Sequence, residues 1–318
     1  MADSADGYRR EPLPPVTGAR APTAAKLRVC RISDPLTLIG DGQMTDSQLE
    51  ISSGTRFAFG ANWKSFVDLV DDTRVEAACR SLTQALGVTD LSGRTFLDIG
   101  CGSGLFSLAA HRLGASVCSF DFDHDSVAAT AGLRRQFAPD SDWTMEQGSI
   151  LDERYVAQLG SFDIVYSWGV LHHTGDLRHA LEIAARLVRP GGMLFVSVYN
   201  DQGFASRQWR RVKRHYNASG RMTRGLLVAG SFAYLARHKP VNAVLGLWRR
   251  PAERKRPVRV RGMSARHDLI DWVGGYPFEV ARPEEVFGIV HPLGFELRHL
   301  KTCGGGLGCN EFVFERTG

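Results

Sequence analysis

A glycine-rich segment near residue 100 constrains the fold of this chain more than any other part of its sequence. It reads FLDIGCGSGLF from Phe96 to Phe106, so an apolar run ends in an acidic residue and glycines follow at positions 100, 102 and 104. The apolar run predicts a β-strand, and the residues from Leu105 to Leu113 predict a helix. Glycines between them allow positive φ angles and a close approach of a ligand to the backbone. The segment therefore predicts a ligand site at the carboxyl end of a strand, beside a helix N-terminus.

A second predicted strand, from Ser116 to Phe120, ends in Asp121. A carboxylate at this place can accept hydrogen bonds from both hydroxyls of a ribose. Dinucleotide-binding folds carry G-x-G-x-x-G at the first turn, whereas the glycines here have the spacing G-x-G-x-G. The sequence thus predicts a nucleotide site, and the spacing disfavours a nicotinamide oxidoreductase.

Three motifs resemble those of the class I S-adenosylmethionine-dependent methyltransferases. Residues 98–104 (DIGCGSG) resemble the first motif of that family, residues 160–173 (GSFDIVYSWGVLHH) its fourth-strand motif, and residues 187–197 (LVRPGGMLFVS) its helix-to-fifth-strand motif. They occur in the expected order over roughly residues 90–200. The resemblance implies a doubly wound, Rossmann-like α/β fold with a seven-stranded sheet, mostly parallel with an antiparallel last strand. It also implies S-adenosylmethionine as the cofactor.

Apolar runs predict that strands and helices alternate through residues 91–200, the expected cofactor-binding core. The expected strands lie at 94–99, 116–121, 143–147, 162–167 and 192–199, and the expected helices at about 104–113, 125–136, 153–158 and 176–187. Residues 190–192 (PGG) predict a turn before the fifth strand. In the C-terminal region, residues 267–318, a helix at about 283–292 and strands at 295–302 and 311–315 are expected to complete the sheet.

Composition divides the remainder of the chain. Residues 1–45 are rich in proline, alanine, glycine and charge, which predicts a mostly disordered tail. Residues 46–90 predict N-terminal cap helices. Residues 201–266 predict a basic helical insert, an acceptor or lid region, in which residues 226–248 are expected to form two helices joined near Pro240. The insert carries seventeen Lys or Arg against two acidic residues, a net charge of +15, while the rest of the chain, with 22 basic and 32 acidic residues, carries −10.

The resemblance assigns the cofactor site residue by residue. Asp98, Gly100, Cys101, Gly102 and Gly104 are expected around the methionine end of the cofactor, Asp121 on the ribose, and Phe122, Ser149 and Ile150 at the adenine. Many relatives have aspartate where this chain has Ser149, so side-chain recognition of the adenine is expected to be weaker.

Aromatic residues on two other segments are also expected at the cofactor. Trp168 and Gly169 follow the fourth strand, where backbone carbonyls of the family meet the cofactor's amino group; core packing is the alternative for Trp168. Phe59 and Trp63 lie about forty residues before the glycines, where relatives close the pocket with an aromatic segment. A plain cap helix is the alternative there.

Two polar clusters are candidates for catalysis. Methyl transfer is an in-line displacement for which a protein mainly aligns the acceptor and excludes water, and a base is needed only when the acceptor loses a proton. His172 and His173 follow the fourth strand, and either could be a base with a pKa near neutrality; capping and packing are the alternative. His267 and Asp268, in a cluster with Asp271, could activate the acceptor if they fold over the pocket, although a surface helix is the alternative.

The spacing of the cysteines and the charge of the insert indicate which metal ions and substrates to expect. The six cysteines lack metal-site spacing, so no metal site is expected. A small-molecule acceptor methylated at oxygen or carbon is expected, either an anionic metabolite or a lipid- or quinone-like molecule gathered at an anionic membrane by the insert. The core broadly resembles the ubiquinone-biosynthesis O-methyltransferases, which is consistent with the second alternative, but the insert does not match them; both alternatives stay open. The sequence carries no signal for an oligomeric state.

Other functions are less well supported. The fourth strand is followed by SWGV rather than the N/D/S-P-P-Y/F motif of base N-methyltransferases, which disfavours nucleic acid as the substrate. An RNA or protein methyltransferase that binds through the insert, and a non-catalytic scaffold, are the alternatives; intact glycines and an intact Asp121 disfavour the scaffold. No apolar run reaches eighteen residues and no signal peptide is visible, so a cytoplasmic protein, peripheral to a membrane in one alternative, is expected.

Overall fold

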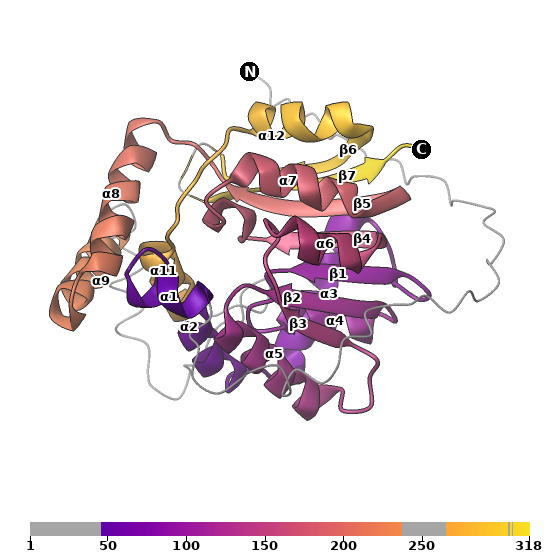
Figure 1. Cartoon of the computed structure of the whole chain (residues 1–318), viewed down its shortest axis with the longest axis horizontal. Helices are drawn as coiled ribbons and strands as arrows, with labels where there is room; N and C mark the ends of the chain where they lie inside the picture. The colour runs from indigo at the N-terminus through magenta and orange to yellow at the C-terminus, as the bar shows by residue number, and fades with distance from the viewer. Residues whose placement is uncertain (1–45, 237–264, 305, 307) are drawn as a thin grey trace, which may run out of the picture.

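The computed structural model describes residues 46–236, 265–304, 306 and 308–318 (Figure 1). Its centre is a seven-stranded sheet in the order β3-β2-β1-β4-β5-β7-β6. The strands are β1 Thr95–Ile99, β2 Ser116–Asp121, β3 Thr144–Gln147, β4 Phe162–Trp168, β5 Val188–Tyr199, β6 Phe295–Lys301 and β7 Cys309–Arg316. Strands β1 to β5 pair in parallel, and β7 is antiparallel to both β5 and β6. The predicted doubly wound α/β fold with an antiparallel last strand is confirmed.

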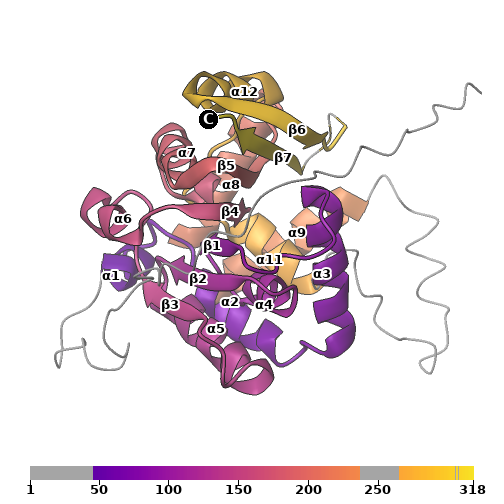
Figure 2. The same ribbon diagram turned by 90° about the vertical axis from the view of Figure 1, so that its right-hand side faces the viewer.

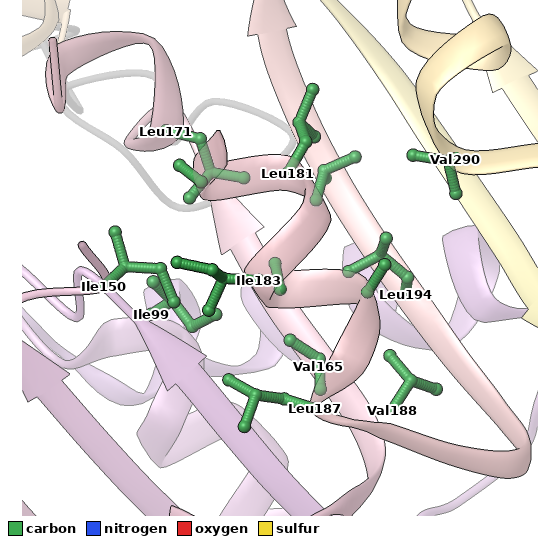
Figure 3. Close-up of a cluster of buried hydrophobic side chains, with 14 of the residues drawn as sticks. Ile99, Ile150, Val165, Leu171, Leu181, Ile183, Leu187, Val188, Leu194 and Val290 are labelled. Carbon is green, nitrogen blue, oxygen red and sulfur yellow. The ribbon is translucent and has the colours of Figure 1, made fainter. Parts of the chain in front are cut away.

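Helices cover both faces of the sheet because its strands are apolar on both sides. One face carries α3 Asp72–Leu86, α4 Leu105–Arg112 and α5 His124–Phe137, and the other α6 Glu153–Leu159, α7 Leu177–Arg186 and α12 Pro283–Val290. Figure 2 shows α6 and α7 on one side of the strands and α3 on the other. Figure 3 shows how Leu181 and Ile183 of α7 meet Val165 of β4 and Leu194 of β5 in one of the two cores.

The fifth strand differs from its prediction. It begins at Val188 rather than at residue 192, so the expected turn at residues 190–192 lies inside the strand. Phe162 of β4 pairs with Val188 of β5, and Ile164 pairs with Met193. Two residues along β4 thus correspond to five residues along β5. The extra residues form a bulge in which Gly191 has a φ of +71°. The proline and glycines thus mark a bulge instead of a turn, which periodicity does not distinguish.

The remaining helices lie around one end of the sheet. They are α1 Asp46–Ser52, α2 Phe59–Val67, α8 Phe204–Ala218, α9 Arg221–Ala236 and α11 Ala265–Gly274, together with the short 3-10 turn η1 Leu171–His173. A second 3-10 turn, η3 His291–Leu293, joins α12 to β6 at the other end of the sheet. Figure 1 shows α8 and α9 beside each other, away from the sheet. Of the two helices expected over residues 226–248, the first overlaps α9, whereas the part from residue 237 on lies outside the described residues, as does the tail at 1–45. Within the described part of the chain, no helix is long and apolar enough to cross a bilayer.

Candidate functional site

A cavity of about 1590 Å³ lies at the carboxyl ends of the parallel strands. Its glycine-loop end is formed by the residues that follow β1, β2 and β3, namely 100–103, 121–123 and 148–152. Its histidine end is formed by His173, Tyr199, Asp271 and Trp272. Phe59 and Trp63 of α2 line the cavity as well, so the cap, the sheet edge and α11 meet there.

The loop after β1 turns tightly because glycine occupies its strained positions. The amides of Gly100 and Cys101 both donate to the carbonyl of Phe120, at 2.8 and 3.1 Å. Gly100 has a φ of +75°, and a Cβ there would lie 2.4 Å from Cγ1 of Val170. Gly102 has a φ of +56°, and its Cβ would lie 3.0 Å from the Trp63 indole nitrogen. The loop is therefore packed against the turn that follows β4 and against the cap, so a side chain at Gly100 would clash with Val170 and one at Gly102 would press on Trp63.

Asp121 is held by the loop that it faces. Its Oδ2 accepts a hydrogen bond from the Gly102 amide and its Oδ1 one from the Asp123 amide, both at 2.9 Å. Burial raises the pKa of Asp121 to about 6. A carboxylate oxygen can accept more than one hydrogen bond, so two ribose hydroxyls can still be bound at this wall.

Asp98 lines the same wall but bonds away from it. Its Oδ2 accepts a hydrogen bond of 2.5 Å from the Ser107 hydroxyl of α4, and burial raises its pKa to about 7. The negative charge of Asp121 raises the pKa of Asp98 further, because like charges close together disfavour ionisation. A cationic ligand would relieve that cost, so this end of the cavity suits a positively charged group.

Cys101 is buried beside these carboxylates, and burial raises the pKa of its thiol well above the usual value. Its Sγ accepts a hydrogen bond from the Thr130 hydroxyl at 3.3 Å. The protonated thiol is therefore a packing group of the loop rather than a nucleophile.

Arg56 connects the two ends of the cavity and was missed in the sequence. Its guanidinium carbon lies 4.6 Å from the centroid of the Phe122 ring. Nε is paired with Glu50 at 2.5 Å, and a terminal nitrogen donates to the carbonyl of His173 at 2.8 Å. One face of Phe122 is thus covered by Arg56, so a planar ligand that packs on Phe122 must use the other. No local pattern distinguishes this arginine from a surface one.

The loops after β3 and β4 complete the glycine-loop end. Ser149 and Ile150 both line the cavity, and the Ser149 hydroxyl accepts from the Leu151 amide at 3.2 Å. Gly169 has a φ of +78° and donates its amide to the Ser197 carbonyl at 3.2 Å. Trp168 lines the cavity and also packs against the core, so both interpretations of its ring have support.

The two histidines take different places in η1. His173 lines the cavity, and its Nδ1 lies 2.6 Å from the Pro277 carbonyl. A carbonyl only accepts, so Nδ1 carries the proton and Nε2 holds a lone pair. His172 is fully buried, with its ring centroid 4.1 Å from that of Tyr199 and 4.4 Å from that of His173.

The expected near-neutral pKa of these histidines is wrong. Burial lowers the pKa of His172 well below its usual value and that of His173 to about 3, and the cation of Lys213 lowers both further. The physical cause is desolvation of the imidazolium form, which the short sequence motif does not reveal. Both rings are therefore neutral at physiological pH.

Lys213 is a buried lysine of the basic insert, and its sequence position alone does not set it apart from the other cations there. It is fully buried, and its Nζ donates to the main-chain carbonyl of Trp272. The ring centroids of Phe278, Trp272 and Tyr199 lie 4.7, 5.2 and 5.4 Å from this nitrogen. Burial lowers its pKa to about 7 although the carboxylate of Asp271 opposes the shift.

Lys213 and a neighbour one turn away hold the end of α11. The side-chain amide of Asn217 donates a hydrogen bond of 2.7 Å to the Gly274 carbonyl, and Lys213 Nζ donates one to the Trp272 carbonyl. The last carbonyls of a helix lack partners within the helix and favour a nearby cation. These contacts fix α11, which places Asp271 and Trp272 on the cavity wall. The signal in the sequence is Lys213 within the buried stripe of α8 with Ser206, Trp209 and Tyr216.

Asp271 is the member of the second polar cluster whose side chain the structure describes, and it reaches the cavity. Asp271 lines the wall and its Oδ1 accepts a hydrogen bond of 2.8 Å from the Asn62 side chain of α2. His267 and Asp268 belong to the first turn of α11, and their side chains lie outside the described part of the structure. Across the residues that the structure does describe, no three His, Cys, Asp or Glu side chains are grouped to hold a metal ion.

Known proteins resemble parts of this chain. Residues 72–229 match the family model described as "Methyltransferase domain". A ubiquinone biosynthesis O-methyltransferase of Sinorhizobium fredii is 34% identical over 110 residues, which cover 35% of this chain and 43% of that protein. One of Xanthomonas oryzae pv. oryzae is 34% identical over 111 residues, covering 35% of this chain and 45% of that protein. The matches thus span less than half the length of these relatives.

Solved structures resemble a larger share of the chain at lower identity. A magnesium protoporphyrin IX methyltransferase from Synechocystis PCC 6803 with bound SAH is 18% identical, with a TM-score of 0.43, over 87% of this chain and 90% of that one. The N-methyltransferase NodS from Bradyrhizobium japonicum in complex with S-adenosyl-L-homocysteine is 14% identical, with a TM-score of 0.44, over 77% of this chain and 86% of that one.

Proposed function

This chain belongs, through residues 72–229, to the methyltransferase-domain family, and we propose that it transfers a methyl group from S-adenosylmethionine to an oxygen or carbon of a small molecule. The observation that carries the proposal is one continuous cavity that joins the glycine loop and Asp121 to His173 and an aromatic wall. Its volume of about 1590 Å³ exceeds the ~300–1,000 Å³ of a usual single-ligand pocket. It therefore has room for an acceptor beside a cofactor.

The residues at the glycine-loop end suit this cofactor. Asp121 would bind the ribose hydroxyls, and the open backbone of Gly100 to Gly102 would face the methionine part. Asp98 and Asp121 are acids with raised pKa values, and a sulfonium cation beside them would favour their ionised forms. Phe59 and Trp63 would close the site from the cap and keep water out. When bound, the cofactor supplies an activated methyl group, so the protein's task is alignment.

The histidine end suits a ring-shaped or apolar acceptor. Tyr199 and Trp272 present aromatic rings to the cavity, and the ring of Phe59 lies 5.0 Å from that of His173, centroid to centroid. Lys213, behind Tyr199 and Trp272, holds the Trp272 main chain. These contacts give a rigid wall against which an acceptor can be held at the distance that an in-line displacement requires.

His173 is the residue that we assign to the acceptor's proton. Its Nε2 lone pair is available at physiological pH because burial keeps the ring neutral. A base of such low pKa does not remove a proton beforehand, so it would accept the hydroxyl proton as the oxygen loses electron density to the new bond. Asp271, on the same wall, is the second group that can bind an acceptor hydroxyl.

The test is calorimetric titration of the full chain with S-adenosylmethionine, S-adenosylhomocysteine and NADH. Micromolar affinity for the two adenosyl compounds and none for NADH is the expected result. Transfer of radiolabelled methyl to catechols, quinols, sugars or carboxylated metabolites would then identify the acceptor class. Failure of both adenosyl compounds to bind, with the protein folded, would overturn the proposal in favour of a scaffold.

A further inference from the structure

Helices α8 and α9 form one positively charged unit. Between Phe204 and Ala236 the chain has seven Lys or Arg and no Asp or Glu. The helices are antiparallel neighbours, because the ring of Trp209 near the start of α8 lies 5.7 Å, centroid to centroid, from that of Tyr234 near the end of α9. Four arginines of α8 are exposed, at positions 207, 210, 211 and 214, and three of them, 207, 211 and 214, recur at the spacing of one helix face.

Large apolar side chains of the same pair are exposed. Met222 and Leu226, one turn apart on α9, have 87% and 73% of their surface accessible, and Phe204 at the start of α8 has 68%. Phe232 is exposed further along α9. Single exposed apolar residues are ordinary, but a group of them on one helix pair indicates a surface that another apolar phase covers.

The inner face of the pair is already occupied. Leu227 and Val228 of α9 pack with Tyr216 of α8 against Val273 and Ile270 of α11. The fully buried side chain of Lys213 also faces inward. The exposed apolar and basic side chains are therefore not needed for the contacts that hold the pair to the rest of the described structure.

We propose that the outer face of α8 and α9 is a docking surface for a membrane that contains anionic phospholipids. Arginines attract an anionic headgroup layer, and exposed Met, Leu and Phe side chains gain free energy by entering the boundary between headgroups and acyl chains. A nucleic acid would match the arginines but not Met222 and Leu226, whereas a neutral apolar protein would match only the latter. An anionic bilayer matches both.

The charge of the whole chain orients this contact. Residues 201–266 carry +15 and the rest carries −10, so an anionic surface attracts the insert and repels the remainder. Because α9 packs on α11, and α11 provides Asp271 and Trp272 to the cavity, the docked membrane would lie behind the histidine end. The inference goes beyond methyl transfer and does not depend on it.

The experiment is co-sedimentation of the full chain with large vesicles of phosphatidylcholine alone or of phosphatidylcholine and phosphatidylglycerol at 7:3. The expected result is binding to the anionic vesicles that falls in 0.5 M NaCl, and at least tenfold weaker binding to neutral ones. The double variant Met222→Glu/Leu226→Glu and the triple variant Arg207→Gln/Arg211→Gln/Arg214→Gln should each lower the binding constant at least tenfold.

Control variants carry the same kinds of substitution on other surfaces of the protein, so they show whether the position of the changed residues matters. Leu300→Glu changes an exposed leucine on β6, and Arg178→Gln/Arg186→Gln changes exposed arginines of α7; both should bind within twofold of the wild type. Circular dichroism and melting temperature check that every variant is folded. The proposal is overturned if wild-type protein binds neither vesicle, if the α8–α9 variants bind as well as the wild type, or if the controls lose binding equally. It is also overturned if sedimentation velocity shows a dimer that Met222→Glu/Leu226→Glu dissociates while vesicle binding persists.

Discussion

Replacement of Asp121 by asparagine tests the cofactor site most directly. The carboxylate accepts two amide hydrogen bonds at 2.9 Å, and the proposal adds two ribose hydroxyls as donors. A hydrogen bond to a charged acceptor contributes ~1.5–3 kcal/mol, against ~1 kcal/mol for a neutral one. The amide keeps one acceptor oxygen and loses the charge, so a loss of about 2 kcal/mol, or about thirtyfold in Kd, is expected.

The assay is calorimetric titration with S-adenosylhomocysteine at pH 7.5 and pH 5. The pKa of Asp121 is about 6 in the free protein, and bound hydroxyls favour the ionised form. Wild-type affinity should therefore fall as the pH drops through 6, and the difference from Asp121→Asn should shrink at pH 5. Asp140→Asn, on an exposed aspartate after α5, is the control. If Asp121→Asn binds within threefold of the wild type at pH 7.5, the ribose assignment is wrong.

Two further predictions concern stability, both measured by urea denaturation. The pKa of Lys213 falls from 10.5 in the unfolded chain to about 7 in the folded one. Between pH 7 and pH 10.5 the unfolded state therefore binds one more proton at this lysine than the folded state does. The free energy of unfolding of the wild type should therefore rise from pH 7 to pH 9 relative to that of Lys213→Met, by at most ~1.4 kcal/mol per pH unit. Parallel plots of this free energy against pH for the two proteins would contradict the prediction. Gly100→Ala should cost several times as much as Gly87→Ala, because both glycines have a positive φ, +75° and +68°, but only Gly100 would place a Cβ on Val170, at 2.4 Å. A left-handed φ alone costs ~1 kcal/mol. Equal losses would mean that contact with Val170 is relieved at little cost.

The sheet and the glycine loop could be predicted because their signals are local. An apolar strand, a glycine-spaced turn and an apolar helix follow one another within residues 96–113, and the structure places β1 and α4 there. Asp121 was placed at the end of β2 by the same reasoning. Strand β5 shows the limit of this approach: residues 190–192 have the composition of a turn, and only the pairing with β4 makes them a bulge.

The electrostatics of the histidine end required the tertiary structure. Adjacent histidines after a strand indicate a base near neutrality, yet the pKa of His173 is about 3. Burial beside Tyr199 of β5 and the segment around Pro277 lowers it, and the charge of Lys213 on α8 lowers it further. Lys213 was one cation among seventeen in the insert, and its burial depends on aromatic rings at positions 199, 272 and 278. A charged side chain's pKa is set by neighbours far away in the chain, which a sequence pattern does not encode.

The sequence by itself determined the alternation of strands and helices, the glycine loop and the acid at the end of the second strand, since these depend on short patterns of apolar residues and glycine. The seven-stranded sheet with its antiparallel last strand was expected from the resemblance to a known family. Only the tertiary structure decided which side chains close the cavity. Arg56 reaches Phe122 and the His173 carbonyl across more than sixty residues of sequence, and Asp271 of α11 lines the cavity wall. Contacts of this range arise from the packing of whole elements, because burial and charge act through space rather than along the chain.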